Sequence, residues 1–135
     1  MASISISEAI AVAEFRAALR TFMRRSERIA RKSGLTPQRY LLLLMVKGAA
    51  DGSEQSTVTE LAERLQLAQS TVTELVSRAE DAGLLEREQS QSDARVAHLR
   101  LTGEGERRLE LAFTALATER AHLRDAIAHL DGAIG

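Results

Sequence analysis

Apolar residues recur at helical spacing over the first quarter of the chain and predict an amphipathic helix over about residues 6–32. Ser5 and Glu8 form a candidate capping box at its start, and Ser33-Gly34 marks its end. Its apolar stripe consists of Phe15, Leu19, Phe22, Met23 and Ile29. Its opposite arc carries Arg16, Arg20, Arg24, Arg28 and Arg31. The apolar face needs a packing partner, whereas solvent is the simplest neighbour for the charged face.

A second helix is predicted from a strong start signal at Thr36 and Pro37. Thr is a favoured N-cap, and Pro fits the first helical position because its missing N–H would have no helical partner there. The following run, YLLLLMVKG, predicts a nearly buried helix that ends at Gly48. The polar stretch AADGSEQS then predicts a loop.

The hexapeptide STVTEL occurs twice, at Ser56–Leu61 and Ser70–Leu75, so that either one helix or two could span this region. No Gly or Pro separates the copies, and a continuous helix with a heptad seam is one solution. However, Leu67 falls off that seam, and period-two alternation begins soon after the second copy. A helix-turn-helix explains both features, with Leu67 as an apolar turn residue packed between the helices. We favour two helices, the first opened by a capping box at Thr57 and Glu60.

The pattern then changes from helical to alternating. LLEREQ and VAHLRL flank the polar stretch QSDAR and predict a two-stranded hairpin over about residues 84–101. Thr102 caps a long helix, about residues 103–131, with one apolar face. The predicted fold is mainly α with a small β-hairpin wing: a winged helix-turn-helix over about residues 36–101. The two terminal helices flank it, and their apolar faces need a partner.

Composition narrows the class of protein. The 135 residues fit one domain, residues 1–135, and 44% apolar but only 3% aromatic residues suit a core of helices packed on helices. The absence of Cys excludes disulfides and thiolate metal sites. With no basic leader and no membrane-spanning stretch, we expect a cytoplasmic protein that does not enter a membrane. No Gly-rich phosphate loop, HExxH or GxSxG is present, so we expect neither an enzyme nor a cofactor.

Charge is distributed unevenly around a net charge of -1. Residues 1–48 carry nine Arg and Lys against three Glu, a balance of +6, whereas residues 57–101 carry five Arg against eight Asp and Glu, a balance of -3. His122 and His129 would lie about 10 Å apart on a helix, too far to share one ion within a chain. We therefore expect no metal site.

The winged segment resembles the multiple antibiotic resistance regulator (MarR) family of bacterial transcription factors. The resemblance is carried by LAERLQLAQSTVTELVSRAEDAGLLERE and SDARVAHLRLTGEG, and it extends to TPQRYLLLLMVKG and so to nearly the whole chain. Its most specific part is Asp93-x-Arg95, followed by Leu101-Thr102 and Gly105. It implies a homodimeric winged-helix repressor or activator whose terminal helices form the dimer interface. Many members release double-stranded DNA when a small, often aromatic or anionic, ligand binds.

The resemblance also implies which residues contact DNA. A recognition helix over about residues 69–82 would enter the major groove, and Arg95 would reach into the adjacent minor groove with Asp93 steadying it. The residues of the helix facing the groove would be Gln69, Ser70, Thr71, Thr73, Glu74, Ser77 and Arg78. Hydroxyl groups at a helix start can meet phosphates or base edges, and the negative potential of a narrow minor groove attracts an arginine.

Two residues favour a competing function. Ala68 stands where many relatives have Ser or Asn, so the helix cap would come from Gln69, Ser70 or water. Glu74 stands where many relatives have a basic residue. With the -3 balance, these features favour a winged-helix protein-interaction module that has lost DNA binding. The leading hypothesis is a DNA-binding homodimeric repressor that recognises a pseudo-palindromic operator and is released by a small ligand.

The aromatic residues have two interpretations. Phe15, Phe22, Tyr40 and Phe113 are all the aromatic residues of the chain, and they either line a ligand pocket or form part of the core. In the pocket interpretation, Arg20 or Arg16 would pair with the carboxylate of an aromatic acid.

Overall fold

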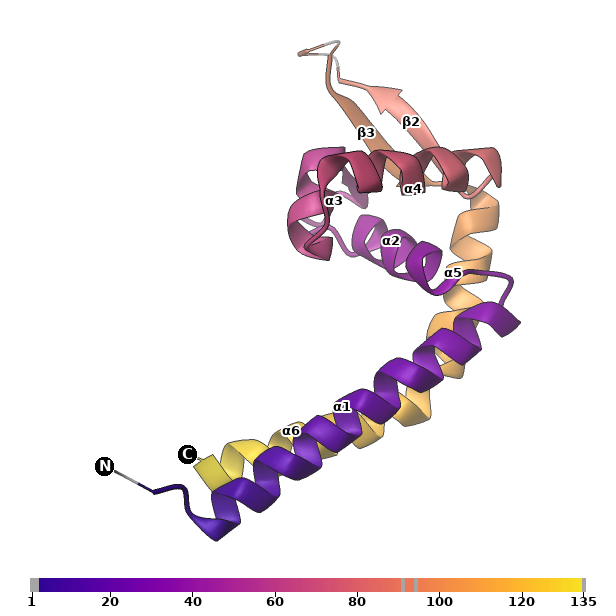
Figure 1. Ribbon diagram of the computed structural model, residues 1–135. Helices are drawn as coiled ribbons and strands as arrows, with labels where there is room; N and C mark the ends of the chain where they lie inside the picture. The colour runs from indigo at the N-terminus through magenta and orange to yellow at the C-terminus, as the bar shows by residue number, and fades with distance from the viewer. Residues whose placement is uncertain (1–2, 91, 94, 135) are drawn as a thin grey trace.

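The protein combines a compact winged body with a long arm, as the computed structural model of the chain shows (Figure 1). It describes residues 3–90, 92–93 and 95–134. Helices in this part are α1 (Ile6–Lys32), α2 (Pro37–Lys47), α3 (Val58–Leu65), α4 (Gln69–Asp81), α5 (Gly103–Ala115) and α6 (Ala117–Ile134); strands are β1 (Gln55–Ser56), β2 (Leu85–Gln89) and β3 (Ala97–Leu101). In the arm, α1 and α6 lie side by side, and α2–α4 with the sheet form the winged body.

Side-chain caps fix where several helices begin. Thr57 accepts from the backbone N–H of Glu60, and the Glu60 carboxylate accepts from the N–H of Thr57, so the predicted capping box is confirmed. The box predicted at α1 is only half formed. Ser5 accepts from the N–H of Glu8 at 3.1 Å, but the Glu8 carboxylate accepts from the Ser5 hydroxyl rather than from its backbone.

The two copies of STVTEL lie on different helices, which confirms the predicted helix-turn-helix. Between them Gln66 adopts a left-handed conformation with φ 57° and ψ 46°, and the N–H of Leu67 donates to the carbonyl of Ala62 at 3.1 Å. The prediction that Leu67 packs between the helices is wrong, since this residue is 41% exposed. A left-handed residue and a backbone hydrogen bond turn the chain here.

The wing belongs to a three-stranded antiparallel sheet in the order β1-β3-β2. The predicted hairpin pairs Arg87 with Leu99, and the two-residue strand β1 adds Ser56 on the other side of Leu99. The sequence did not predict β1 because it lies at the end of a stretch with loop composition. Its pairing is set by β3, which is more than forty residues away in the sequence.

The predicted helix over residues 103–131 is two helices. It breaks at Leu116, which is fully buried and has φ -95° and ψ 6°. Arg120 on α6 contacts Phe113 on α5 across the break. Its Nη1 donates to the carbonyl of Phe113 at 2.7 Å, and its guanidinium carbon lies 3.7 Å from the centroid of the Phe113 ring. The change of direction lets α5 pack under the winged body while α6 follows α1 (Figure 1).

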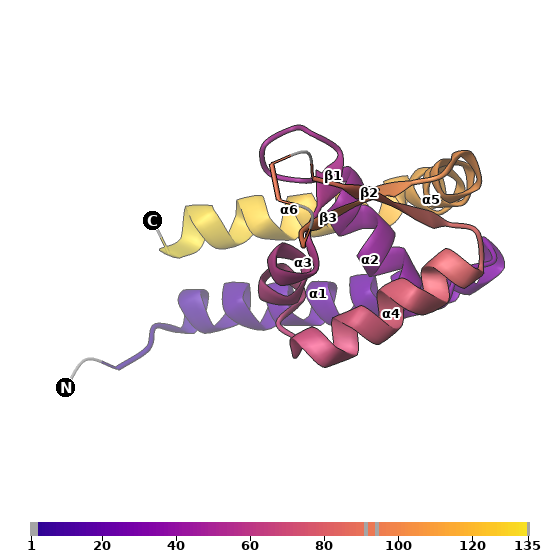
Figure 2. The same ribbon diagram turned by 90° about the horizontal axis from the view of Figure 1, so that it is seen from above.

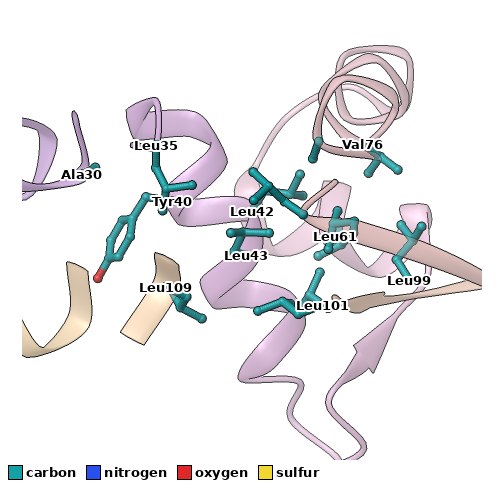
Figure 3. Close-up of a cluster of buried hydrophobic side chains, with 14 of the residues drawn as sticks. Ala30, Leu35, Tyr40, Leu42, Leu43, Leu61, Val76, Leu99, Leu101 and Leu109 are labelled. Carbon is teal, nitrogen blue, oxygen red and sulfur yellow. The ribbon is translucent and has the colours of Figure 1, made fainter. Parts of the chain in front are cut away.

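Helix α2 lies at the centre of the hydrophobic core (Figure 3). Leu42 and Leu43 are fully buried between the neighbouring helices and the sheet, and Val76 on α4 and Leu99 on β3 close the cluster. Burial of one such side chain contributes about 1.5–3 kcal/mol, so this cluster fixes α4 on the winged body. Among the described residues, no helix is long and apolar enough to cross a membrane.

Candidate nucleic-acid interface

Helix α4 has one buried and one exposed face. Val72, Val76 and Ala79 are fully buried against the core. The predicted contact residues all lie on the exposed side: Gln69, Ser70, Thr71, Thr73, Glu74, Ser77 and Arg78. Asp81 shares this face and was not predicted, although its helical spacing of seven from Glu74 was a usable signal.

The first turn of α4 has no side-chain cap. Ala68 occupies the N-cap position, and no side chain accepts a hydrogen bond from the first N–H groups. The side chain of Gln69 turns the other way and donates to the hydroxyl of Thr59 at 3.3 Å. Of the three caps that the sequence leaves open, Gln69, Ser70 or water, the two side chains are therefore excluded. Nothing in the described protein occupies these N–H groups, which can bind an anion.

Glu74 is paired within its own helix. Its Oε1 accepts from Nη2 of Arg78 at 2.5 Å, and both side chains are 63% exposed. The carboxylate thus neutralises the arginine one turn further along. In the sequence alone, Glu74 favours a protein-interaction module; in the structure, its charge is paired with that of Arg78.

The wing carries Arg95 at its tip, and that side chain is 91% exposed. Both its backbone N–H and its Nε donate to Oδ1 of Asp93, at 3.0 and 3.2 Å. The predicted steadying contact between the two residues is therefore present. The tip projects beyond α4 on the side of the winged body that faces away from the arm (Figure 1). Seen from above, α4 lies along one edge of the winged body, with α2 and the sheet on its inner side (Figure 2).

Each arginine of the acidic segment 57–101 has a partner within the chain. Arg64 donates to the carbonyls of Met45 and Gly48 at 3.1 and 3.0 Å. The other four form ion pairs: Arg78–Glu74, Arg87–Glu80, Arg95–Asp93 and Arg100–Glu88. By contrast, the arginines of the α1 stripe are exposed and form no ion pair within the described residues. The surplus positive charge therefore lies on the arm.

The predicted ligand residues do not meet in one place. Phe22 and Tyr40 line a cavity of about 150 Å³ between α1 and α2, whose other walls are Met23, Ser26, Glu27, Pro37, Leu41 and Leu44. Phe15, Arg20 and Phe113 are not among its described lining residues, of which Glu27 alone is charged. Burial raises the pKa of Tyr40, and the nearby charge of Arg120 partly opposes this shift.

One histidine of α6 lies beside a carboxylate of α1. Nδ1 of His129 lies 2.9 Å from Oε2 of Glu14 on α1, which joins the two helices of the arm. In the described part of the chain, no three side chains of the metal-binding types come together.

Known proteins share this architecture. Residues 33–96 match the model of the MarR family. Among solved structures, a mutant of E. coli MarR in complex with operator DNA is 19% identical, with a TM-score of 0.71 over 98% of this chain and 96% of that chain. A mutant of S. aureus MepR bound to an oligodeoxyribonucleotide is 20% identical, with a TM-score of 0.67 over 82% and 79%. AbsC, a MarR family transcriptional regulator from Streptomyces coelicolor, is 22% identical, with a TM-score of 0.64 over 96% and 84%.

No curated protein matches the chain significantly. The α4 and wing geometry together define a winged helix-turn-helix protein with the fold of these transcription regulators. The family match over residues 33–96, from the turn before α2 to the wing, adds that this segment is similar in sequence to the MarR family.

Proposed function

We propose that this chain is a DNA-binding transcriptional regulator that represses genes as a homodimer bound to a pseudo-palindromic operator. One observation carries the proposal: α4 and the β2–β3 hairpin both lie on the side of the winged body away from the arm (Figure 1), and the outer residues of α4 and Arg95 of the wing are exposed. A helix and a hairpin tip placed in this way can enter a major groove and the next minor groove together.

The arm supports the homodimer. Large apolar side chains are exposed along its helices and along α5: Ile6, Ile10, Val12, Met23, Leu111, Phe113, Ile127 and Ile134. A surface of this kind, which the winged body does not cover, is typical of an interface between subunits. Sedimentation at micromolar concentration should give twice the chain mass of 14.7 kDa. A monomer would remove the physical basis for a palindromic operator.

DNA binding can be tested with one variant and one control. Wild-type protein should select a palindromic sequence from random duplexes, and its affinity should fall with rising salt. Arg95→Ala should weaken binding to this operator by about 1–3 kcal/mol per site, because the wing loses its charge in the minor groove. Arg16→Ala is the matched control, since it removes the same charge from the arm, and it should change affinity far less.

A wild type that binds no duplex selectively at low salt would contradict the proposal. If Arg95→Ala then also matched the wild type, the protein-interaction module would take its place. The acidic winged segment is the observation that favours this second function.

Release by a small ligand is the second part of the proposal. The cavity at Phe22 and Tyr40 lies between the arm and the winged body, where a bound molecule could alter their relative position. Its apolar walls and single carboxylate, Glu27, favour a small neutral aromatic compound over an aromatic acid. In a thermal-shift screen, neutral compounds should raise the melting temperature more than their acid analogues. If the acid analogues raised the melting temperature more, the ligand would instead be an aromatic acid paired with the arginines of α1.

A further inference from the structure

The ion pair of α4 lies at the centre of its exposed face. Ser70, Glu74, Ser77 and Asp81 follow one another at helical spacing along this face, and Arg78 adjoins Glu74 one turn further on. Nη2 of Arg78 donates to Oε1 of Glu74 at 2.5 Å. The two exposed side chains therefore form an ion pair whose charges cancel.

Helix stability is a weak reason for this pair. An exposed pair four residues apart contributes only about 0.3–0.5 kcal/mol. The contact instead sets how the remaining donors and acceptors lie in this structure. Nη2 carries two N–H groups, so donation of one to Glu74 leaves the other in a two-donor fork with either Nε or Nη1. Oε2 of Glu74 has no partner among the described residues and stays available as an acceptor.

This arrangement matches the major-groove edge of one kind of base pair. From guanine to cytosine, a G·C pair presents two acceptors, N7 and O6, and then the donor N4 amino group. The fork of Arg78 beside the carboxylate of Glu74 presents two donors and then an acceptor. An A·T pair presents an acceptor, a donor, an acceptor and a methyl group. There a donor of the fork would meet the N6 amino group of adenine, and the carboxylate would face O4 and the methyl group.

We propose that Glu74 and Arg78 act as a unit that reads one G·C base pair in each half-site of the operator. Arg78 donates to N7 and O6 of the guanine, and Glu74 both orients that arginine and accepts from N4 of the paired cytosine. The inference rests on the proposed function, because it requires that α4 enters the major groove. It assigns Glu74 a specificity-determining role in DNA binding, whereas the sequence alone places Glu74 among the features that favour a protein-interaction module.

The test compares the wild type and four variants, one of them a control, on a set of duplexes. Wild type, Glu74→Ala, Arg78→Ala and the double variant are titrated against the selected operator and against versions with each half-site base pair changed in turn, at one salt concentration. Glu63→Ala is the matched control, since Glu63 is an exposed glutamate on α3, outside the recognition helix. All variants change exposed residues of helices to alanine, which favours helix formation.

We expect the wild type to prefer G·C over A·T at one position of each half-site by about ten- to a hundredfold. Each single variant should reduce this preference at the same position to within about threefold, and the double variant should lose no more than the single ones. Glu63→Ala should keep the full preference, even if the change in charge alters its overall affinity.

Three results would overturn the proposal. In the first, Glu74→Ala tightens binding to all duplexes alike and keeps the G·C preference, which would show that the carboxylate only masks positive charge. In the second, the two single variants relax different base pairs, so that the residues act independently. In the third, the wild type selects no sequence at all; the proposed function fails together with the inference in this case only.

Discussion

The start of α5 lies against the segment that leads into the wing, and Gly105 makes this close approach possible. A Cβ atom at Gly105 would lie 2.2 Å from the carbonyl oxygen of Leu84 and 3.1 Å from its carbonyl carbon. Thr102 holds the two segments together. Its N–H donates to the Leu84 carbonyl at 3.1 Å, and its hydroxyl donates to the Gly83 carbonyl at 2.6 Å while accepting from the N–H of Gly105 at 3.0 Å.

We predict that Gly105→Ala lowers the free energy of unfolding by about 2 kcal/mol. The new methyl group must move about 0.8 Å to reach the shortest tolerated approach of 3.0 Å, and the obstructing atom is a backbone oxygen that cannot rotate away. Such overpacking costs about 1–3 kcal/mol or more, and the better helix propensity of alanine offsets about 1 kcal/mol of it. A domain of this size loses about 3–5 °C in melting temperature per kcal/mol, so the expected loss is about 6–10 °C.

Gly103→Ala is the control for this prediction. Gly103 lies two residues earlier in the same helix, and a Cβ atom there would have no heavy atom within 4 Å. This variant should therefore be neutral or stabilised by up to about 1 kcal/mol. Urea unfolding followed by circular dichroism measures both variants against the wild type. Equal midpoints for the two variants would refute the view that the close approach to Leu84 is fixed by the fold.

Two further predictions concern the ion pairs on α5. Arg107 and Arg108 both donate to Glu104, but only Arg108 also reaches the carbonyl of Gly34, at 3.0 Å, in the turn between α1 and α2. Arg108→Ala should therefore lower the free energy of unfolding by about 1 kcal/mol and Arg107→Ala by less, and equal losses in urea unfolding would contradict this assignment. Hydrogen bonds from Arg107 and Arg108 lower the pKa of Glu104 from 4.5 to about 2. Its contribution to stability should be present above pH 4.5 and lost as the pH falls toward 2, so that the urea midpoint of Glu104→Gln should fall less than that of the wild type between pH 5 and pH 3.

Local signals in the sequence were sufficient for most helix starts but not for the features that depend on tertiary packing. Thr57 and Glu60 specify their helix start by side-chain chemistry that acts within one turn, and this signal was recognised. The break at Leu116 has no such signal, since neither Gly nor Pro is nearby and the apolar pattern continues through it. It follows from the need of α5 and α6 to pack on different parts of the protein. Strand β1 was missed for the same reason, because β3 determines its pairing.

The candidate site was predictable to the extent that it follows helical periodicity. The exposed positions of α4 follow from the spacing of Val72, Val76 and Ala79 on its other face. The ligand cavity was not predictable in this way. The four aromatic residues were considered together only because they are all the aromatic residues of the chain, and not because a spacing pattern brings them together. Phe15 and Phe22 are seven residues apart on α1, which separates them by about 10 Å, and only Phe22 meets Tyr40.

The internal ion pairs bear on how an acidic winged body could select an operator. Non-specific DNA binding is almost entirely electrostatic, so every arginine held by an acid of the same chain lowers it. Arg78, Arg87, Arg95 and Arg100 are all held in this way. A specific site can offer a narrow minor groove to Arg95 and base edges to the intact pair of Arg78 and Glu74, whereas random DNA offers mainly phosphates. On the proposed function, the negative balance of residues 57–101 would therefore lower affinity for competing sequences more than affinity for the operator. A high ratio of specific to non-specific affinity, with a modest salt dependence, is the behaviour that this charge pattern favours.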